Sequence, residues 1–258
     1  MLPMQFMLVF VVLTGAVVGS FLNVCIYRMP LEQSIISPGS RCMSCGSEVR
    51  WFDNIPIVSW FLLRGRCRRC GTGFSIRYPL IELLTAGLFL LLFLRFGPSL
   101  SFIVYALLVA SLIVVTFIDL DHQIIPDEIS LPGIGLGFLA SFFLPEPGWF
   151  SSLLGMIAGW GSLALVFYGY LWLTGREGMG GGDAKLLAML GAFLGLQAVP
   201  FIIFTSSLVG TVAGLSIMAL QRKGRHLAIP FGPYLAFGAV LYIFYGPWLI
   251  NWYLRLGK

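Results

Sequence analysis

Two aspartates are the side chains of this sequence best placed to do acid–base chemistry, because each lies at one end of a long apolar stretch. Asp119 closes one apolar run, and Asp183 follows Gly180-Gly-Gly182 and opens another. A carboxylate at the mouth of a membrane helix costs free energy unless it has a partner or a function. For Asp183 the alternative is structural, since an aspartate at a helix N-terminus accepts hydrogen bonds from free N–H groups and complements the helix dipole.

The two carboxylates can act as a pair if packed helices bring them together. Helices pack roughly 8–10 Å apart, which would place two inward-facing aspartates within reach of one water molecule. Two half-buried carboxylates then share one proton and titrate as a unit. One activates water as a base while the other, protonated, polarises a carbonyl group, which is the chemistry of an aspartyl protease. The same pair could instead carry protons or bind a cation in a transporter.

Other polar residues after Asp119 have simpler explanations. Asp127 and Glu128 follow Pro126 and precede an apolar run, so we expect them to complement a helix N-terminus. Asp121 and His122 are expected to be solvated loop residues. The catalytic prediction therefore rests on Asp119 and Asp183.

Four cysteines form two matched C-x-x-C pairs, each followed by a glycine that permits a tight turn. The cysteines are Cys42, Cys45, Cys67 and Cys70, and the glycines are Gly46 and Gly71. Four thiolates at this spacing suit tetrahedral Zn²⁺, and with protein atoms at all four positions the metal would be structural. One alternative is that the cysteines form two disulfides or remain free, but a cytoplasmic loop is reducing and disfavours disulfides. Another is a redox role, which needs only one C-x-x-C pair. The fifth cysteine, Cys25, is expected to pack at a helix end.

Two further features lie close to the cysteines. The apolar segment 51–63 could pack on the metal knuckles, lie in the membrane interface or grip a hydrophobic substrate, and we expect packing. Glu82 lies inside the next apolar run. We interpret it as a partner of the helix dipole, with pairing to an arginine of the cysteine loop as the functional alternative.

The composition indicates a polytopic membrane protein. Of the 258 residues, 58% are hydrophobic and 10% are charged, and the mean hydropathy is +0.92, values that no soluble globular domain requires. Segments long enough to cross a core of roughly 30 Å number about eight. They are 4–24, 79–96, 100–118, 130–145, 151–173, 184–198, 199–220 and 230–254, of which the fourth and sixth are short.

The cations predict the orientation of these segments. If the first helix runs from outside to inside, all 16 lysines and arginines lie in the cytoplasm except Arg95, Arg255 and Lys258. This is a strong positive-inside bias, and it places Asp119 and Asp183 on the cytoplasmic side. The excess of cations behind the net charge of +5 is thus explained by the orientation of the chain in the membrane. Because the cations are not interleaved with aromatic residues as on a nucleic-acid surface, no nucleic-acid partner is expected.

The motifs together resemble the bacterial type IV prepilin peptidases, which are GxGD membrane aspartyl proteases. Gly180-Gly-Gly182-Asp183 fits the GxGD motif, and Asp119 precedes Asp-His-Gln-Ile-Ile-Pro-Asp. The resemblance also covers the sequence Gly-Ser-Phe-Leu-Asn-Val-Cys-Ile-Tyr-Arg-Met-Pro at 19–30, the paired C-x-x-C loop, and Tyr-Pro-Leu-Ile-Glu at 78–82. These motifs occur in the family's order over almost the whole chain.

The resemblance implies a bifunctional enzyme of the bacterial inner membrane. It implies cleavage of prepilins or type II secretion pseudopilins after a glycine on the cytoplasmic side. N-methylation of the new N-terminus, usually phenylalanine, with S-adenosylmethionine would follow. Asp119 and Asp183 correspond to the catalytic pair and the four cysteines to the zinc site, while Arg64-Gly65-Arg66 is the region in which we expect the methyl donor.

The expected fold class is an all-α polytopic membrane protein with a small cytoplasmic zinc-knuckle domain inserted after the first helix. Three parts are predicted. Residues 1–24 form the first transmembrane helix, 25–78 the zinc-binding, methyltransferase-associated loop, and 79–258 the helical protease core. The expected partners are prepilin substrates and membrane lipids. A transporter would instead show paired repeats with broken helices, which this sequence lacks, and a non-catalytic zinc scaffold would have no use for two acids at helix mouths.

Overall fold

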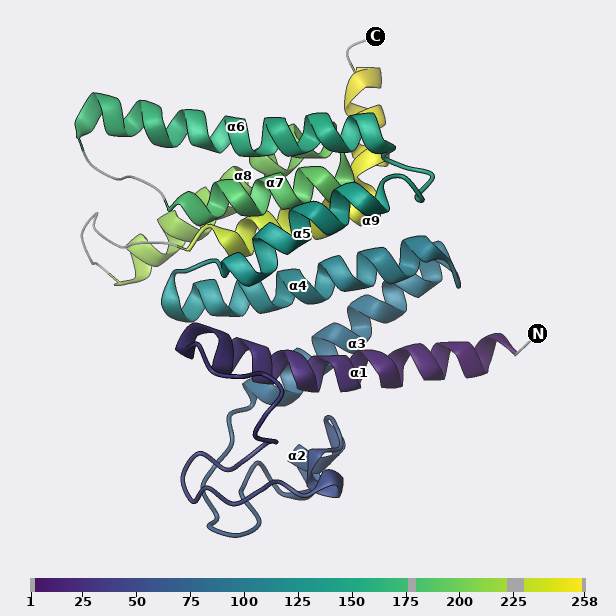
Figure 1. The fold of residues 1–258 in the computed structure, drawn as a ribbon, viewed down its shortest axis with the longest axis vertical. Helices are drawn as coiled ribbons and strands as arrows, with labels where there is room; N and C mark the ends of the chain where they lie inside the picture. The colour runs from purple at the N-terminus through teal and green to yellow at the C-terminus, as the bar shows by residue number, and fades with distance from the viewer. Residues whose placement is uncertain (1–2, 176–179, 222–229, 257–258) are drawn as a thin grey trace. The chain divides into compact units, whose positions relative to one another are not determined.

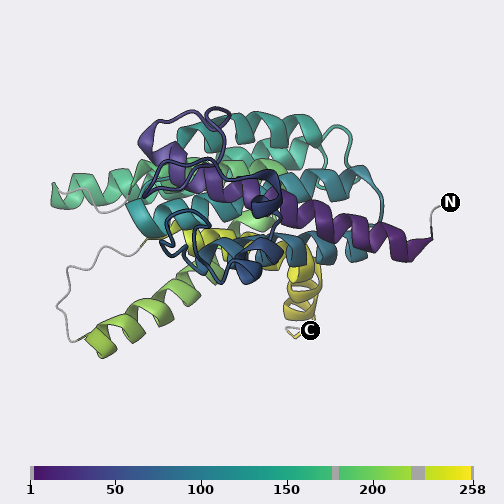
Figure 2. The same ribbon diagram turned by 90° about the horizontal axis from the view of Figure 1, so that it is seen from below.

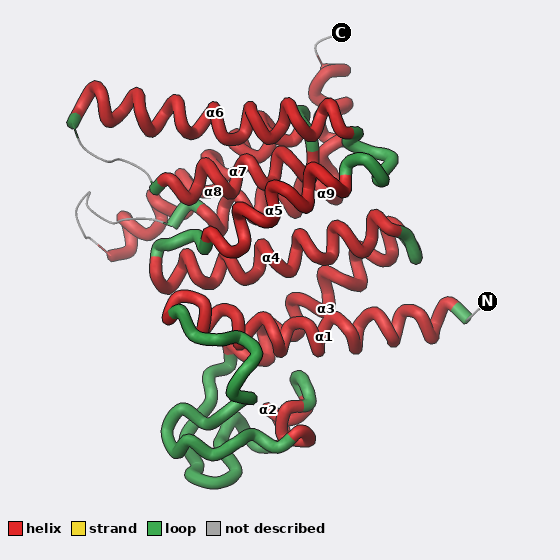
Figure 3. Tube along the Cα trace, viewed as in Figure 1, coloured by secondary structure: helices red, strands yellow, loops and turns green. Residues whose placement is uncertain are grey.

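The computed structural model describes residues 3–175, 180–221 and 230–256. The chain forms two compact units, residues 1–114 and 115–258. The colouring in Figure 3 shows that helices dominate both units and that the cysteine region is mostly loop. Gly178 and the predicted cytoplasmic residues Arg176, Arg222, Lys223 and Arg225 lie outside the described residues. The three-part division expected from the sequence stays a prediction.

The first unit is built on two long helices that pack against each other, α1 (Met4–Arg28) and α3 (Arg77–Phe96) (Figure 1). Two glycines one helical turn apart allow this contact. A Cβ on Gly15 would lie 2.7 Å from Cα of Ala86, and one on Gly19 would lie 2.7 Å from Cα of Glu82. Small residues at this spacing let two backbones approach closely where no hydrophobic effect drives helices together.

The connection between α1 and α3 carries the cysteines and three short helices. These are η1 (Met29–Leu31), η2 (Trp51–Asn54) and α2 (Val58–Leu62). Asn23 fastens the end of α1 to the start of α3, because its Nδ2 donates to the carbonyl oxygen of Tyr78 at 3.2 Å. Helix α4 (Leu100–His122) begins in the first unit and ends in the second.

The second unit surrounds one short, buried helix with longer ones. The helices are α5 (Asp127–Ala140), α6 (Trp149–Thr174), α7 (Gly181–Leu194), α8 (Ala198–Gln221) and α9 (Gly232–Leu256). Helix α7 contacts α5, α6, α8 and α9, and nearly all of its side chains are buried. It lies alongside α6 in Figure 1, and Figure 2 shows the same ribbon from below.

Glycines on the facing helices again set the distance to α7. A Cβ on Gly159 of α6 would collide with the carbonyl oxygen of Leu187, and one on Gly133 of α5 would collide with the sulfur of Met189. Ser152 of α6 adds a buried hydrogen bond, donating from Oγ to the carbonyl oxygen of Ala192 at 2.6 Å. A helix that is apolar all round is stable only when covered in this way.

The predicted all-α polytopic architecture is confirmed. A helix occupies the place of each of the eight predicted segments, and six are long and apolar enough to cross a membrane. Helices α5 and α7 have 14 residues each, which at about 1.5 Å per residue falls short of a core of roughly 30 Å. For α7 the surrounding helices explain the shortfall, because the helix is buried in protein from Leu186 to Leu194.

Two predicted boundaries were wrong. Helix α4 does not stop at residue 118 but continues to His122, so Asp119 lies in its last turn, and the prediction that Asp121 and His122 are loop residues was wrong. Hydropathy falls at the first acid, whereas the helical hydrogen bonds continue for another turn. Helix α7 ends at Leu194 because Gly195 adopts a positive φ of 82°. Pro200, expected in the linker, lies in the first turn of α8, where its missing N–H costs nothing.

Candidate active site and metal centre

Asp119 is buried and hydrogen-bonded at the start of another helix. Its side chain lies in the last turn of α4 and is 4% exposed. The backbone N–H of Gly232, the first residue of α9, donates to Asp119 Oδ2 at 2.8 Å. Because a helix N-terminus carries partial positive charge, this contact stabilises the ionised carboxylate. Gly232 must be glycine here, since a Cβ would lie 2.7 Å from the same oxygen.

Asp183 lies in the first turn of α7 and is 9% exposed. The N-cap of this helix is Gly180, so Asp183 is three residues further on and the N-cap interpretation is wrong. Gly182, beside it, packs against Ile125 of the α4–α5 connection. These neighbours anchor the glycine-rich entrance of α7 close to the end of α4.

The structure brings the two carboxylates into electrostatic contact. Helix α7 contacts α9, whose first residue binds Asp119. Asp183 is outside the six candidate spans, and burial, followed by repulsion from the Asp119 carboxylate, raises the pKa of Asp183 to about 7. A pair of this kind holds one proton at neutral pH, and the N–H from Gly232 favours Asp119 as the ionised partner.

The acids near this pair have the structural roles expected of them. Asp127 and Glu128 lie in the first turn of α5, as predicted. Asp127 also pairs with Lys185 of α7, whose Nζ lies 2.8 Å from Oδ1. Both partners are substantially exposed, so the pair contributes little to stability, but it links the starts of α5 and α7. Asp121 and His122 are exposed.

The four predicted cysteine ligands meet in one cluster. Their Sγ atoms all lie within 4.8 Å of one another, and those of Cys42 and Cys70 are 3.7 Å apart. Thiolates in a tetrahedron around zinc, at about 2.3 Å from the metal, lie about 3.8 Å apart, whereas disulfide sulfurs lie about 2.0 Å apart. The cluster therefore suits a metal ion, and all five cysteines of the chain are free of disulfides. Cys25 is buried in α1, as expected.

The two cysteine knuckles have the same backbone structure. In the first knuckle, Cys42 N–H donates to the carbonyl oxygen of Ser47, and Gly46 N–H donates to that of Cys42. In the second, Cys67 N–H donates to the carbonyl oxygen of Thr72, and Gly71 N–H donates to that of Cys67. All four distances are 2.8–2.9 Å. The two glycines adopt positive φ values of 67° and 73°, as the tight turns require. Hydrogen bonds from Ser47 lower the pKa of Cys45 to about 6, and backbone N–H groups of Cys70 and Arg69 lower that of Cys67. The thiolate, which is the form that binds metal, is thus favoured at Cys45 and Cys67.

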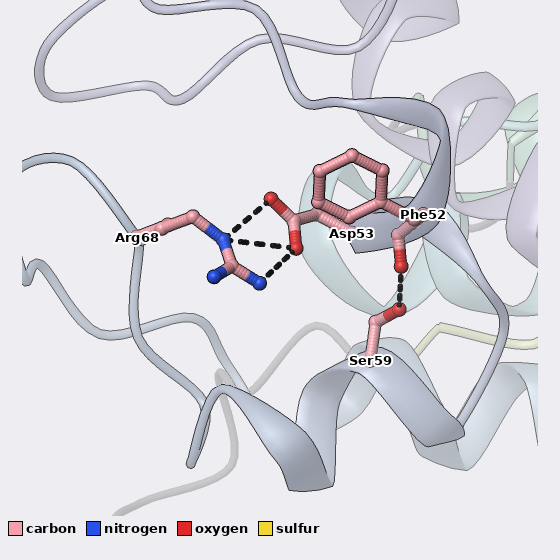
Figure 4. Close-up of polar contacts among 4 residues, drawn as sticks. All are labelled: Phe52, Asp53, Ser59 and Arg68. Carbon is pink, nitrogen blue, oxygen red and sulfur yellow. Dashed lines mark hydrogen bonds and ion pairs between the residues drawn. The ribbon is translucent and has the colours of Figure 1, made fainter.

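The loop between the knuckles is fastened by an ion pair. Arg68 binds both carboxylate oxygens of Asp53, with Nη2 to Oδ1 at 2.7 Å and Nε to Oδ2 at 2.9 Å, and Ser59 Oγ donates to the carbonyl oxygen of Phe52 (Figure 4). The hydrogen bonds and charge of Arg68 hold the pKa of Asp53 below its usual value. Bidentate pairing of this kind fixes geometry as well as charge.

The apolar segment 51–63 does not pack as expected. Trp51, Phe61 and Leu62 are 81%, 62% and 77% exposed, so the prediction that the segment covers the knuckles was wrong for them. Trp60 turns inward, and its Nε1 donates to the carbonyl oxygen of Phe74 at 3.3 Å.

Glu82 was also interpreted wrongly from the sequence. A partner of the helix dipole would lie in the first turn of α3. The helix begins at Arg77, so Glu82 lies beyond that turn. No arginine binds it among the ion pairs of the described residues. Its Oε2 instead accepts the backbone N–H of Ile57 at 2.6 Å, and the side chain is 7% exposed.

Two contacts of buried carboxylates were missed from the sequence, those of Gly232 with Asp119 and of Ile57 with Glu82. A signal existed for the first, because Gly232 stands between Pro230 and Pro233 at the start of an apolar run, a pattern typical of a constrained helix N-terminus. For the methyl-donor region, Gly65 is buried while Arg64 and Arg66 are exposed.

Comparisons with known proteins agree with the motifs. Residues 13–96 match the bacterial peptidase A24 N-terminal domain, and residues 106–215 match the type IV leader peptidase family. The chain is similar to three enzymes named prepilin leader peptidase/N-methyltransferase. The one from Neisseria gonorrhoeae is 44% identical over 86% of this chain and 84% of the relative. That of Pseudomonas aeruginosa is 38% identical over 98% and 95%. That of Aeromonas salmonicida is 36% identical over 97% and 94%. No solved structure matches the chain.

Proposed function

The chain belongs to the type IV leader peptidase family, and from that premise we propose that it is a membrane aspartyl endopeptidase and N-methyltransferase of prepilins. It removes the leader of type IV prepilins or type II secretion pseudopilins after a glycine, then methylates the new N-terminus, usually phenylalanine. The observation that carries the peptidase activity is the buried pair Asp119 and Asp183, whose charges interact. The curated relatives are named as peptidases and not as transporters, so the transporter alternative has no comparable support.

The two aspartates divide the work according to their surroundings. Asp119, stabilised as an anion by the Gly232 N–H at the start of α9, takes the proton from the attacking water. Asp183, which retains a proton near neutral pH, donates a hydrogen bond to the scissile carbonyl oxygen and polarises it. The tetrahedral intermediate collapses when the amine leaves with a proton, and the pair returns to its starting state.

The remaining parts of the proposal concern metal, methyl donor and membrane orientation. The cysteine cluster binds one structural Zn²⁺, because four thiolates leave no open position for chemistry. S-adenosylmethionine supplies the methyl group, as the names of the relatives imply. The distribution of cations places Asp119, Asp183 and the cysteine loop on the cytoplasmic side of the bacterial inner membrane.

The direct test uses membranes that contain the wild-type chain or one of three variants, incubated with a prepilin. Asp119→Asn and Asp183→Asn should each abolish the size shift of the substrate while the protein still accumulates. Asp121→Asn is the matched control, because it removes an exposed carboxylate two residues from Asp119, and it should cleave normally. Full processing by either of the first two variants would rule out the pair as the catalytic site.

A further inference from the structure

The first unit contains an open cavity between α1, α3 and the cysteine loop. Its volume is about 160 Å³, or about 970 Å³ when the open space out to the mouth is included. Four aromatic side chains lie among the polar and aliphatic residues of the wall. The lining includes Tyr27, Trp60, Phe74, Tyr78, Arg28 and Glu82.

The most unusual wall residue is Glu82. It is a carboxylate inside an apolar helix and is 7% exposed. Its partners are the N–H of Ile57 and the hydroxyl of Ser20, and none of the ion pairs of the described residues involves it. A buried carboxylate without a cation is costly. Glu82 is therefore a carboxylate of the cavity wall whose ionised form has no cationic partner among the ion pairs of the described residues.

The loop residue that binds Glu82 is held in a strained conformation. Ile57 has a φ of 64°, which is rare for a β-branched residue. Such strain persists where the surrounding contacts over-determine it, and it concentrates at functional sites. Here the contact is the 2.6 Å hydrogen bond from Ile57 to Glu82, which joins the loop to α3 across the cavity.

A second loop position is shaped around the same cavity. Gly65 has a φ of 63°, and a Cβ on it would lie 2.9 Å from the Trp60 ring. The absence of a side chain at Gly65 thus leaves room for the indole, whose Nε1 donates to the carbonyl oxygen of Phe74. Gly65 is the central residue of the segment Arg64-Gly65-Arg66, so the cavity includes part of the region expected to bind the methyl donor.

A buried carboxylate near aromatic side chains can hold an onium cation. Aromatic faces attract such cations, and a nearby carboxylate adds the counter-charge. Arg28, at the same cavity, is held by the carbonyl oxygens of Ser34 and Gly39 and can meet a carboxylate group. An onium cation joined to an amino-acid carboxylate and an aromatic ring fits all of these features.

We propose that this cavity is the binding site for S-adenosylmethionine and that Glu82 is the counter-charge of its sulfonium group. The proposal rests on the methyltransferase activity given above. In the transfer, the lone pair of the neutral N-terminal amine forms a bond to the methyl carbon, and the carbon–sulfur bond breaks with its electron pair going to sulfur. The methylated ammonium then releases one proton to water at the open mouth of the cavity.

This role for Glu82 distinguishes donor from product. The sulfonium is cationic in S-adenosylmethionine, whereas the thioether of S-adenosylhomocysteine is neutral. A carboxylate beside the sulfur therefore favours the donor, and it assists release of the product after each turnover.

The test is calorimetric titration of both ligands into the purified full-length chain in lipid nanodiscs. Glu82→Gln keeps an oxygen to accept the Ile57 N–H, so it should fold and should cleave prepilin at the wild-type rate. It should bind S-adenosylmethionine about tenfold more weakly or worse, with less than threefold change for S-adenosylhomocysteine. Glu32→Gln, which removes an exposed charge from the same unit outside the cavity, should bind both ligands as wild type does.

The outcomes separate this site from the wider function. Unchanged donor affinity in Glu82→Gln, or equal losses for the two ligands, would overturn the role of Glu82 while methylation by the wild type stands. A wild-type chain that cleaves prepilin but binds neither ligand would overturn the proposed methyl donor, and with it this site.

Discussion

The two units of this chain each bury carboxylates, and they do so in opposite ways. In the second unit, Asp119 and Asp183 are close enough for each charge to oppose the other. In the first unit, Glu82 is buried alone, with a backbone N–H and a hydroxyl as partners. Their exposed fractions are similar, between 4% and 9%, so burial is not what distinguishes them.

The difference lies in how each site balances its charge. A pair of carboxylates retains a proton, which makes one member an acid and the other a base. A single carboxylate in an aromatic cavity gains most from an external cation. The same residue chemistry therefore suits bond hydrolysis in one unit and cation binding in the other.

The largest expected effect is a complete separation of the two activities. Asp183→Asn should lower cleavage by at least about a thousandfold, yet it should methylate a pre-cleaved pilin peptide beginning with phenylalanine within a few-fold of the wild-type rate. The reason is that methyl transfer has no use for a carboxylate pair. Radiolabel transfer to the peptide measures this, and parallel loss of both activities would mean that the two chemistries share one site.

Removal of the metal should strongly affect donor binding, which the first unit carries out, and should affect cleavage much less. Purified protein should contain about one zinc per chain, and a Cys42→Ser/Cys67→Ser double variant should contain none. Because structural zinc contributes roughly 10 kcal/mol or more to folding of small metal domains, the cavity wall from Trp60 to Phe74 should loosen and donor binding should fall below detection. Elemental analysis with titration of the donor checks both. Cys25→Ala, which removes a thiol outside the cluster, should retain zinc, and a metal-free wild type that binds the donor would contradict the assignment.

A smaller effect is expected from the glycine at the start of α9. In Gly232→Ala the new methyl group would lie 2.7 Å from Asp119 Oδ2 and would displace the N–H that stabilises its charge. A hydrogen bond to a charged group contributes about 1.5–3 kcal/mol, so cleavage should fall about ten- to a hundredfold with donor affinity unchanged. Gly161→Ala, where the added Cβ meets nothing within 4 Å, serves as the control. Equal rates for the two variants would remove Gly232 from the site.

The most gradual effect is on pH dependence. Cleavage requires protonated Asp183, whose pKa is raised to about 7, so kcat/KM for cleavage should be maintained below that pH and fall as pH rises through it. Methyl transfer requires a neutral α-amine, whose ordinary pKa is about 8, so its rate should rise over the same interval. Rates measured on both substrates between about pH 5.5 and about pH 9, an interval that includes both pKa values, check this. Profiles that rise or fall together would contradict the division.

The sequence allowed the helices and the four metal ligands to be predicted because both depend on local patterns. Apolar runs and C-x-x-C spacing are readable over a few residues, and the knuckle glycines adopted the positive φ expected of them. The end of α4 was misplaced because hydropathy and helical hydrogen bonding stop at different residues. The contacts of Asp119 with Gly232 and of Glu82 with Ile57 span 113 and 25 residues. No periodicity encodes such contacts, which arise only when helices pack.

The hydrogen bond between Asp119 and Gly232 has a consequence for biosynthesis. Ribosomes release Asp119 long before they reach Gly232, and α7 is too short to be held across a bilayer by itself. The carboxylate pair therefore acquires its final surroundings only after α9 has been made and inserted. A nascent chain that ends before α9 would thus lack the Gly232 contact of Asp119, and we expect it to lack peptidase activity.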